Sequence, residues 1–285
     1  MMRYTIKTFN ETFPDDDICL DYMFEQASSN MQACPKCGVA NPSYYRVRGR
    51  KCFECKDCGN QIHPLSGTIF HKSATSLRSW FYIIYLFSVA KNGVSAKEVE
   101  RHLGVTYKCA WRIAKQVREL MQQETGALTG IIETDETYIG GRKRGKDITF
   151  QGKEIVFGMV ERGGKVKAAH VKSAGSRVLL PRLRDSVAVG TTVYSDQARV
   201  YTTLKRLGYL HDSVNHSAGE YGRGVVHTNT IEGFWGQLKR SIDGTYHCVS
   251  PKYLQSYVNE FVYRYNHRQN PVFPVLIAVA ARRVQ

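Results

Sequence analysis

Two Cys-x-x-Cys pairs constrain the fold of this chain more than any other feature of its sequence. They lie in the stretch CPKCGVANPSYYRVRGRKCFECKDCG, which covers residues 34–59. Two residues between paired cysteines let both thiolates face one ion, and about twenty residues between two such pairs are typical of a zinc ribbon. The spacing predicts a zinc-ribbon unit over residues 31–73, in which structural Zn²⁺ compensates for a core that is too small on its own.

The ligand set has one ambiguity, because Cys52 and Cys55 are also separated by two residues. We favour the later pair, since CKDCG repeats the form of CPKCG, with a permissive glycine after the second cysteine. Cys52 is then a small strand residue, and five unrelated buried thiols are the alternative. The predicted zinc ligands are Cys34, Cys37, Cys55 and Cys58.

The net charge of the chain indicates what kind of molecule it binds. Forty Lys and Arg against 25 Asp and Glu leave a net charge of +15, which favours an anionic polymer, usually nucleic acid. A ribosome-associated or membrane-surface protein could carry the same sign. The chain has no run of about 18 apolar residues and begins without the apolar core of a signal peptide. We therefore expect no membrane span and a cytoplasmic protein, associated with the nucleoid when it is bound to DNA.

Residues 74–125 carry the periodicity of helices, after an acidic-centred arm over residues 1–30. Ser95 is expected to cap one short helix, Gly104 to make a turn, and Thr106 to cap a second, basic helix that includes Arg118. This order fits a helix-turn-helix, although an ordinary helical hairpin with a solvated basic face fits it as well. The net charge favours DNA, and the predicted DNA-binding residues are Tyr107, Lys108, Arg112 and Lys115.

From residue 126 to residue 285 the pattern changes to strands and helices in the order β-β-β-α-β-α-β-α. Gly163–Gly164 indicates a tight hairpin between the second and third strands. The order predicts an α/β domain with a mixed sheet that begins as a hairpin meander.

Three acids in this region are candidates for a metal site. Asp135 lies in the first strand, Asp196 at the end of the fourth, and Glu232 on the helix after the fifth. An acid in an apolar strand is costly unless it is paired or metal-bound, and bound divalent cations would offset the repulsion among three carboxylates. Oxygen ligands select Mg²⁺ or Mn²⁺, and two such ions serve phosphodiester chemistry.

Each acid also has a structural alternative. Asp135 stands between Glu133 and Glu136, and any of the three could be a solvated residue. Asp196 could belong to a turn at the strand end. Glu232 could close a capping box, with Asn229 as the N-cap whose backbone N–H the Glu side chain reaches.

The whole pattern resembles a known family. The order of elements resembles the RNase H-like fold, and the 35 residues between Asp196 and Glu232, with Lys239 seven residues further, resemble the DDE transposases. More closely, the chain resembles bacterial insertion-sequence transposases that combine an N-terminal zinc ribbon with a DDE domain, along nearly all of its length after residue 20. The stretches that carry the resemblance are ETDETYIGG, YSDQARVY, HTNTIEGFWGQLKR, YHCVSPKYLQSYVNEFVYRYNHR and CKDCGNQIHPLSGTIFHKSATSLRSWF.

The resemblance implies roles for individual residues. Asp135, Asp196 and Glu232 would be catalytic ligands of two Mg²⁺ or Mn²⁺ ions, and Lys239 would contact a phosphate near the scissile bond. Asn229 or His227 could assist, and Trp235 is expected to be a core aromatic residue.

The implied function is that of a DNA transposase. It would bind the terminal repeats of its element as a homo-oligomer, cleave the DNA ends and join them to double-stranded target DNA. Two rivals share these features: a zinc-ribbon DNA-binding regulator with an inactive DDE-like domain, and another RNase H-like nuclease.

Overall fold

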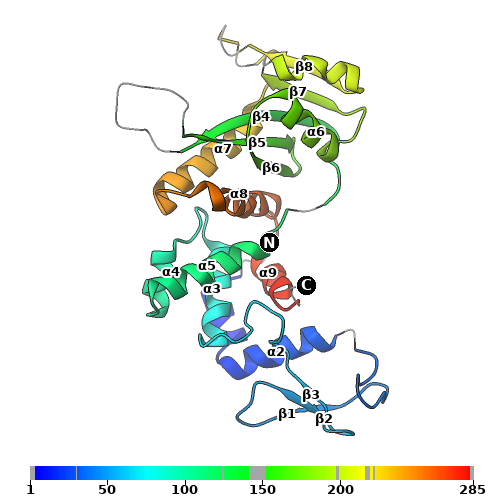
Figure 1. The fold of residues 1–285 in the computed structure, drawn as a ribbon, viewed down its shortest axis with the longest axis vertical. Helices are drawn as coiled ribbons and strands as arrows, with labels where there is room; N and C mark the ends of the chain where they lie inside the picture. The colour runs from blue at the N-terminus through cyan, green and yellow to red at the C-terminus, as the bar shows by residue number, and fades with distance from the viewer. Residues whose placement is uncertain are drawn as a thin grey trace. The chain divides into compact units, whose positions relative to one another are not determined.

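The computed structural model describes residues 4–29, 31–123, 125–140, 152–196, 199–215, 219–220 and 222–282. The chain forms two compact units (Figure 1). The first contains Met1–Leu120 and Asn270–Gln285, and the second contains Met121–Gln269. Among the described residues, no helix is long and apolar enough to cross a membrane.

The first unit begins with two short helices and a small sheet. The helices are α1 (Ile6–Thr12) and α2 (Asp16–Ser28), and the sheet has the antiparallel order β1 (Tyr44–Arg46), β2 (Phe53–Cys55), β3 (Gln61–Ile62). Gly38 and Gly59 follow the two cysteine pairs with φ of 72° and 69°, the left-handed region that a side chain would disfavour. The ribbon predicted from the cysteine spacing is therefore present as a three-stranded unit with two tight knuckles.

Four more helices complete the first unit: α3 (Leu77–Val89), α4 (Ala96–Leu103), α5 (Tyr107–Leu120) and α9 (Val272–Ala280). The predicted helix-turn-helix signals are confirmed, since Ser95 Oγ accepts the Glu98 N–H and Gly104 ends α4 at φ 64°. Cys109 N–H donates to Thr106 Oγ1 at 3.4 Å, which starts α5 as expected.

The last helix differs from the sequence-based boundary, which ran the α/β domain to residue 285. The segment VFPVLIAVA of α9 is apolar nearly throughout and packs on α3 and α5. Its Phe273 joins an aromatic cluster with Phe9, Phe13 and Tyr85. The apolar pattern predicts burial but does not say which core the helix enters.

The second unit is built on a five-stranded mixed sheet. Its strands are β4 (Ile131–Ile139), β5 (Glu154–Glu161), β6 (Val166–Val171), β7 (Thr192–Asp196) and β8 (Leu210–Val214), in the order β6-β5-β4-β7-β8. The first three strands pair antiparallel, whereas β7 is parallel to both β4 and β8. This is the RNase H-like sheet that the sequence predicts, with the hairpin at Gly163 in a left-handed turn.

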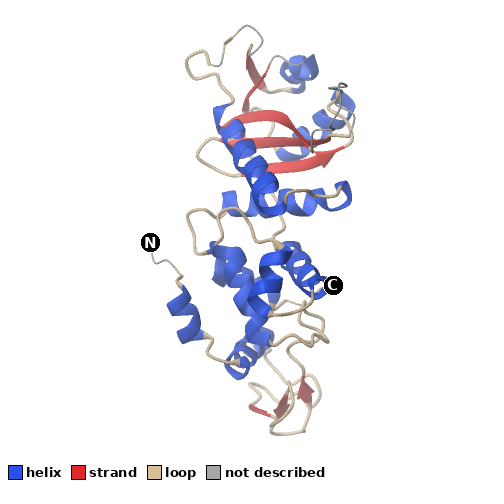
Figure 2. Cartoon of the chain, turned by 90° about the vertical axis from the view of Figure 1, so that its left-hand side faces the viewer, coloured by secondary structure: helices blue, strands red, loops and turns tan. Residues whose placement is uncertain are grey.

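Helices cover both faces of this sheet (Figures 1 and 2). One face is covered by α7 (Asn229–Ser241), its short π-helical extension η3 (Ile242–Tyr246) and α8 (Pro251–Asn266). The other is covered by α6 (Ser176–Ser186) and the 3₁₀ helix η1 (Arg199–Leu207). Because side chains alternate along a strand, Ile139 of β4 packs with α7 while Ile132 packs with α6 and η1. The same alternation aims Asp135 at α7.

Candidate active site

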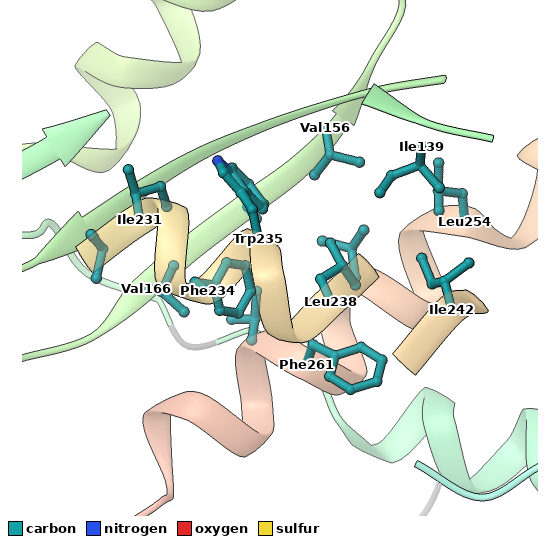
Figure 3. Packing of buried hydrophobic residues seen from close by; sticks show 14 residues of the cluster. Ile139, Val156, Val166, Ile231, Phe234, Trp235, Leu238, Ile242, Leu254 and Phe261 are labelled. Carbon is teal, nitrogen blue, oxygen red and sulfur yellow. The ribbon is translucent and has the colours of Figure 1, made fainter. Parts of the chain in front are cut away.

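Asp135 lies in the middle of β4, on the face that α7 covers. Its partner across the antiparallel pair is Gly158 of β5. Trp235 of α7 lies against this pair and donates its indole N–H to Asp135 Oδ2 at 3.0 Å. Figure 3 shows Trp235 projecting from α7 toward the strands within the buried cluster. Trp235 is therefore the core aromatic residue expected from the sequence, and it also orients the Asp135 carboxylate.

Gly158 is what allows the indole to come so close. A Cβ at Gly158 would lie 2.5 Å from Trp235 Cη2, closer than real Cβ contacts, and 3.1 Å from Ile231 Cδ1, which is tighter than most of them. The absence of a side chain at Gly158 therefore sets how closely α7 packs on β5.

We expect Gly158→Ala to destabilise the second unit by about 1–3 kcal/mol, because overpacking forces either the indole or the helix to move. Gly233→Ala is the matched control in α7, where a Cβ would meet no heavy atom of the described residues within 4 Å. It should stabilise the helix by up to about 1 kcal/mol. Thermal unfolding followed by tryptophan fluorescence measures both, and equal effects of the two alanines would contradict this packing.

Asp196 is brought beside Asp135 by the strand register. Glu133 of β4 pairs with Tyr194 of β7 in parallel, and each acid stands two residues further along its own strand. The pKa of Asp135 is raised to about 7, first by burial and then by the negative charges of Glu136 and Asp196. Burial and the neighbouring charges both disfavour the ionised form of Asp135, and a bound divalent cation would offset both effects.

Glu232 and Lys239 lie along one face of α7, in the first and last turns of the helix. Both line an open pocket of about 500 Å³ together with Asp135. Gly236 stands between them at helical spacing and also lines the pocket, and a Cβ there would lie 3.3 Å from Nη1 of the Arg240 side chain. The remaining lining residues are Glu136, Thr137, Tyr138, Lys153 and Trp235.

The capping alternative for Glu232 is wrong in its details. The N-cap position belongs to Thr228, and Asn229 is already the first helical residue. Glu232 accepts a hydrogen bond from the Thr228 hydroxyl, Oγ1, at 2.7 Å. The free amides of this helix end are bound by Glu133, which is fully buried. Glu133 is thus a buried structural acid, and the expectation that it could be a solvated residue is wrong.

Glu136, the other neighbour of Asp135, points to the opposite face. Its carboxylate accepts the Tyr201 hydroxyl at 2.5 Å, and burial raises its pKa. The Tyr201 side chain is itself fully buried, so this acid has a defined structural partner.

The four predicted zinc ligands come together in the ribbon. The sulfur atoms of Cys34, Cys37, Cys55 and Cys58 all lie within 4.8 Å of one another. The backbone N–H groups of Cys37 and Lys36 point to Cys34 and lower its pKa to about 6. Cys52 is buried apart from this cluster, with its sulfur 3.9 Å from Gln61 Oε1. Four thiolates in this arrangement suit tetrahedral Zn²⁺.

The carboxylates form a looser arrangement than the thiolates. In the described part of the chain, the four cysteines are the one set of potential ligand atoms found gathered tightly enough to hold an ion. Asp135, Asp196 and Glu232 nevertheless supply only oxygen donors, the set that Mg²⁺ and Mn²⁺ prefer. The raised pKa of Asp135 agrees with a site whose charge a cation would balance.

The predicted DNA-binding residues differ in exposure. Tyr107, Lys108 and Arg112 are exposed at the start of α5, whereas Lys115 is half-buried and pairs with Glu119 at 3.3 Å. Arg118, which the sequence placed on the same basic helix, is buried and donates to the Val94 carbonyl at 3.0 Å. Arg118 therefore stabilises the turn before α4 and is not available to DNA.

Two domain families match the sequence. Residues 14–61 match the transposase zinc-ribbon domain, and residues 127–266 match the ISXO2-like transposase domain. An uncharacterized protein in transposable element ISH50 of Halobacterium salinarum is 28% identical over 252 residues, covering 81% of this chain and 84% of the relative. An uncharacterized transposase-like protein of Haemophilus influenzae is 28% identical over 105 residues, covering 37% of this chain and 84% of the relative.

Solved structures show only distant similarity. The simian T-cell lymphotropic virus intasome in complex with a PP2A regulatory subunit matches with a TM-score of 0.30 and 14% identity, covering 62% of this chain and 73% of that chain. The Mos1 strand transfer complex matches with a TM-score of 0.22 and 11% identity, covering 72% of this chain and 79% of that chain. The assignment of the fold therefore depends on the strand order of the sheet. The assignment of the family depends on the two matched domains, whose order along the chain is the order that the sequence predicts. The chain belongs to the insertion-sequence transposases that join a zinc ribbon to an ISXO2-like DDE domain.

Proposed function

We propose that this chain is an active DNA transposase that binds the terminal repeats of its element, cleaves the DNA ends and joins the freed 3′-hydroxyl groups to target DNA. The observation that carries the proposal is the meeting of acids at one place on the sheet. Burial, and then the charges of Glu136 and Asp196, raise the pKa of Asp135 to about 7, and Glu232 and Lys239 line the same pocket as Asp135. An acid with a perturbed pKa that lies in a cleft beside other acids is typical of a catalytic site.

Asp135, Asp196 and Glu232 would hold two Mg²⁺ or Mn²⁺ ions. When bound, such ions activate a water or a 3′-hydroxyl for attack and stabilise the leaving oxygen. Both cleavage and joining are in-line displacements at phosphorus, so one site can serve both steps.

The protein groups around the acids orient them and receive the substrate. The indole N–H of Trp235 fixes Asp135 Oδ2 at 3.0 Å, which holds the carboxylate in one orientation. Lys239 would contact the phosphate next to the scissile bond. Gly236 adds no side chain of its own between Glu232 and Lys239, which leaves more room for a sugar–phosphate backbone beside α7.

The first unit would hold the DNA ends. Tyr107, Lys108 and Arg112 are exposed on the second helix of the helix-turn-helix, where groove or phosphate contacts are made in this motif. Lys115 would add a phosphate contact from the next turn. We expect a homo-oligomer on DNA, since two ends of one element must be joined together.

The proposal is tested by strand transfer with purified full-length protein and labelled duplexes of the element's own ends, in Mg²⁺ or Mn²⁺. We expect metal-dependent cleavage at the end, followed by joined products. Cleavage without joining would favour another RNase H-like nuclease, and binding without cleavage would favour a regulator. Because phosphate contacts release counterions, DNA affinity should fall steeply with salt, and a salt-independent affinity would contradict the DNA-binding part of the proposal.

A further inference from the structure

We propose that Glu133 and Arg162 form a buried ion pair that positions Glu232 relative to Asp135 and Asp196, an inference that rests on the function proposed above. Neither residue is a metal ligand in that function. Glu133 is fully buried, and a buried carboxylate needs hydrogen-bond donors or an opposite charge around it.

The first contact of Glu133 is with the N-terminus of α7. Its Oε2 accepts the backbone N–H groups of Thr230 at 2.7 Å and of Ile231 at 3.1 Å, and its Oε1 accepts the Thr230 hydroxyl at 2.9 Å. These amides are among those a helix leaves unbonded at its start, and a negative charge there is also favoured by the helix dipole. A side chain of β4 thus caps the N-terminus of α7, a helix that begins about a hundred residues later in the chain.

The second contact is with Arg162, the residue directly after β5. Arg162 Nε donates to Glu133 Oε1 at 2.6 Å, and its two terminal nitrogens donate to the carbonyl groups of Val225 at 2.7 Å and His227 at 2.9 Å. The guanidinium also lies over the Tyr194 ring, 5.0 Å from the centroid. Arg162 therefore holds the segment that leads into α7, and through the Tyr194 ring it also contacts β7.

These contacts connect the elements that carry the three acids. Glu133 stands two residues before Asp135 on β4 and on the same face, while Tyr194 stands two residues before Asp196 on β7. Ile231, whose amide Glu133 binds, directly precedes Glu232. The pair therefore determines how far along the sheet the first turn of α7 lies, and so where the Glu232 carboxylate enters the pocket.

The same unit contains a matched control. Glu260 of α8 is also fully buried and is also paired with an arginine, Arg264, at 2.7 Å. It accepts the Tyr246 hydroxyl at 2.9 Å, which fastens η3 to α8. Glu260 is therefore a buried acid of similar surroundings that does not bind the N-terminus of α7.

The test compares Glu133→Gln with Glu260→Gln in the full-length protein. Mn²⁺ binding is measured by electron paramagnetic resonance of the free ion, without any reaction, and hydrogen exchange is followed by mass spectrometry in a peptide covering residues 228–234. We expect Glu133→Gln to weaken Mn²⁺ binding about 10- to 100-fold, the usual effect of losing a group that orients a ligand, and to speed exchange in this peptide. Glu260→Gln should lower thermal stability but keep the wild-type Mn²⁺ affinity.

A second variant covers the case in which Glu133→Gln does not fold. Glu133→Asp keeps the charge beside Arg162 but withdraws it by one methylene from the amides of Thr230 and Ile231, so it should show the same two changes in smaller measure. Wild-type Mn²⁺ affinity and wild-type exchange in a folded Glu133 variant would overturn the inference while strand transfer by the wild type left the proposed function standing. A wild-type protein that bound no Mn²⁺ would instead contradict the proposed function, and the positioning role with it.

Discussion

Glu232→Gln is expected to lose cleavage and strand transfer by a factor of at least about 10³ while the protein stays folded and bound to DNA. Stabilisation of the transition state by bound cations amounts to several kcal/mol, and each 1.4 kcal/mol is a factor of ten in rate. An amide is a poor ligand for Mg²⁺, but its oxygen can still accept the hydrogen bond that Thr228 Oγ1 gives at 2.7 Å. The change therefore removes the charge and leaves the helix start as it is.

The control for this prediction is Asp243→Asn, an exposed acid in η3 at the far end of the same helical segment. It removes the same charge and should leave the reaction unchanged. Gel assays of cleavage and joining, with a mobility-shift assay for DNA binding, measure both variants. Cleavage by Glu232→Gln at the wild-type rate would mean that the carboxylate supports only the hydrogen bond with Thr228 and that the third acid lies elsewhere.

Features that depend on neighbours in sequence could be predicted well. The turn between α4 and α5 follows from Ser95, Gly104 and Thr106, each of which acts within four residues of its own position. The hairpin at Gly163 and the start of α8 at Ser250–Pro251 are local in the same way. The strand order then followed from the sequence of elements and from the resemblance of the motifs to a known family.

Features that depend on distant partners could not be predicted. A capping box assigned to Asn229 and Glu232 is locally reasonable, but Asn229 is already helical, and the amides of Thr230 and Ile231 in the first turn are bound by Glu133 from β4. A basic helical face suggests that Arg118 is exposed, yet its guanidinium is buried over the Phe87 ring. In each case the local pattern predicts that a helix forms. Contacts with residues far away in the sequence determine which of its groups are buried and what they bind.

Loss of the folded zinc ribbon is the second large effect that we expect. Serine variants that cause it or leave it unchanged show which cysteines bind zinc. Cys55→Ser should lower the zinc content and unfold residues 31–62, because binding of structural zinc is the main source of folding free energy in such units, about 10–16 kcal/mol in zinc-finger peptides. Cys52→Ser should keep its zinc, since its sulfur lies beside Gln61 Oε1 at 3.9 Å and outside the cluster of four thiolates.

Elemental analysis of the purified proteins measures the zinc content, and limited proteolysis reports whether the ribbon is folded. Both variants replace a buried cysteine with serine, at positions three residues apart, so a general cost of burying a hydroxyl would affect them alike. A difference in zinc content therefore reports ligation and not packing. If Cys52→Ser loses zinc and Cys55→Ser keeps it, the proposed ligand set is wrong. The left-handed conformation of Gly59, which follows Cys58, would then have no metal site to explain it.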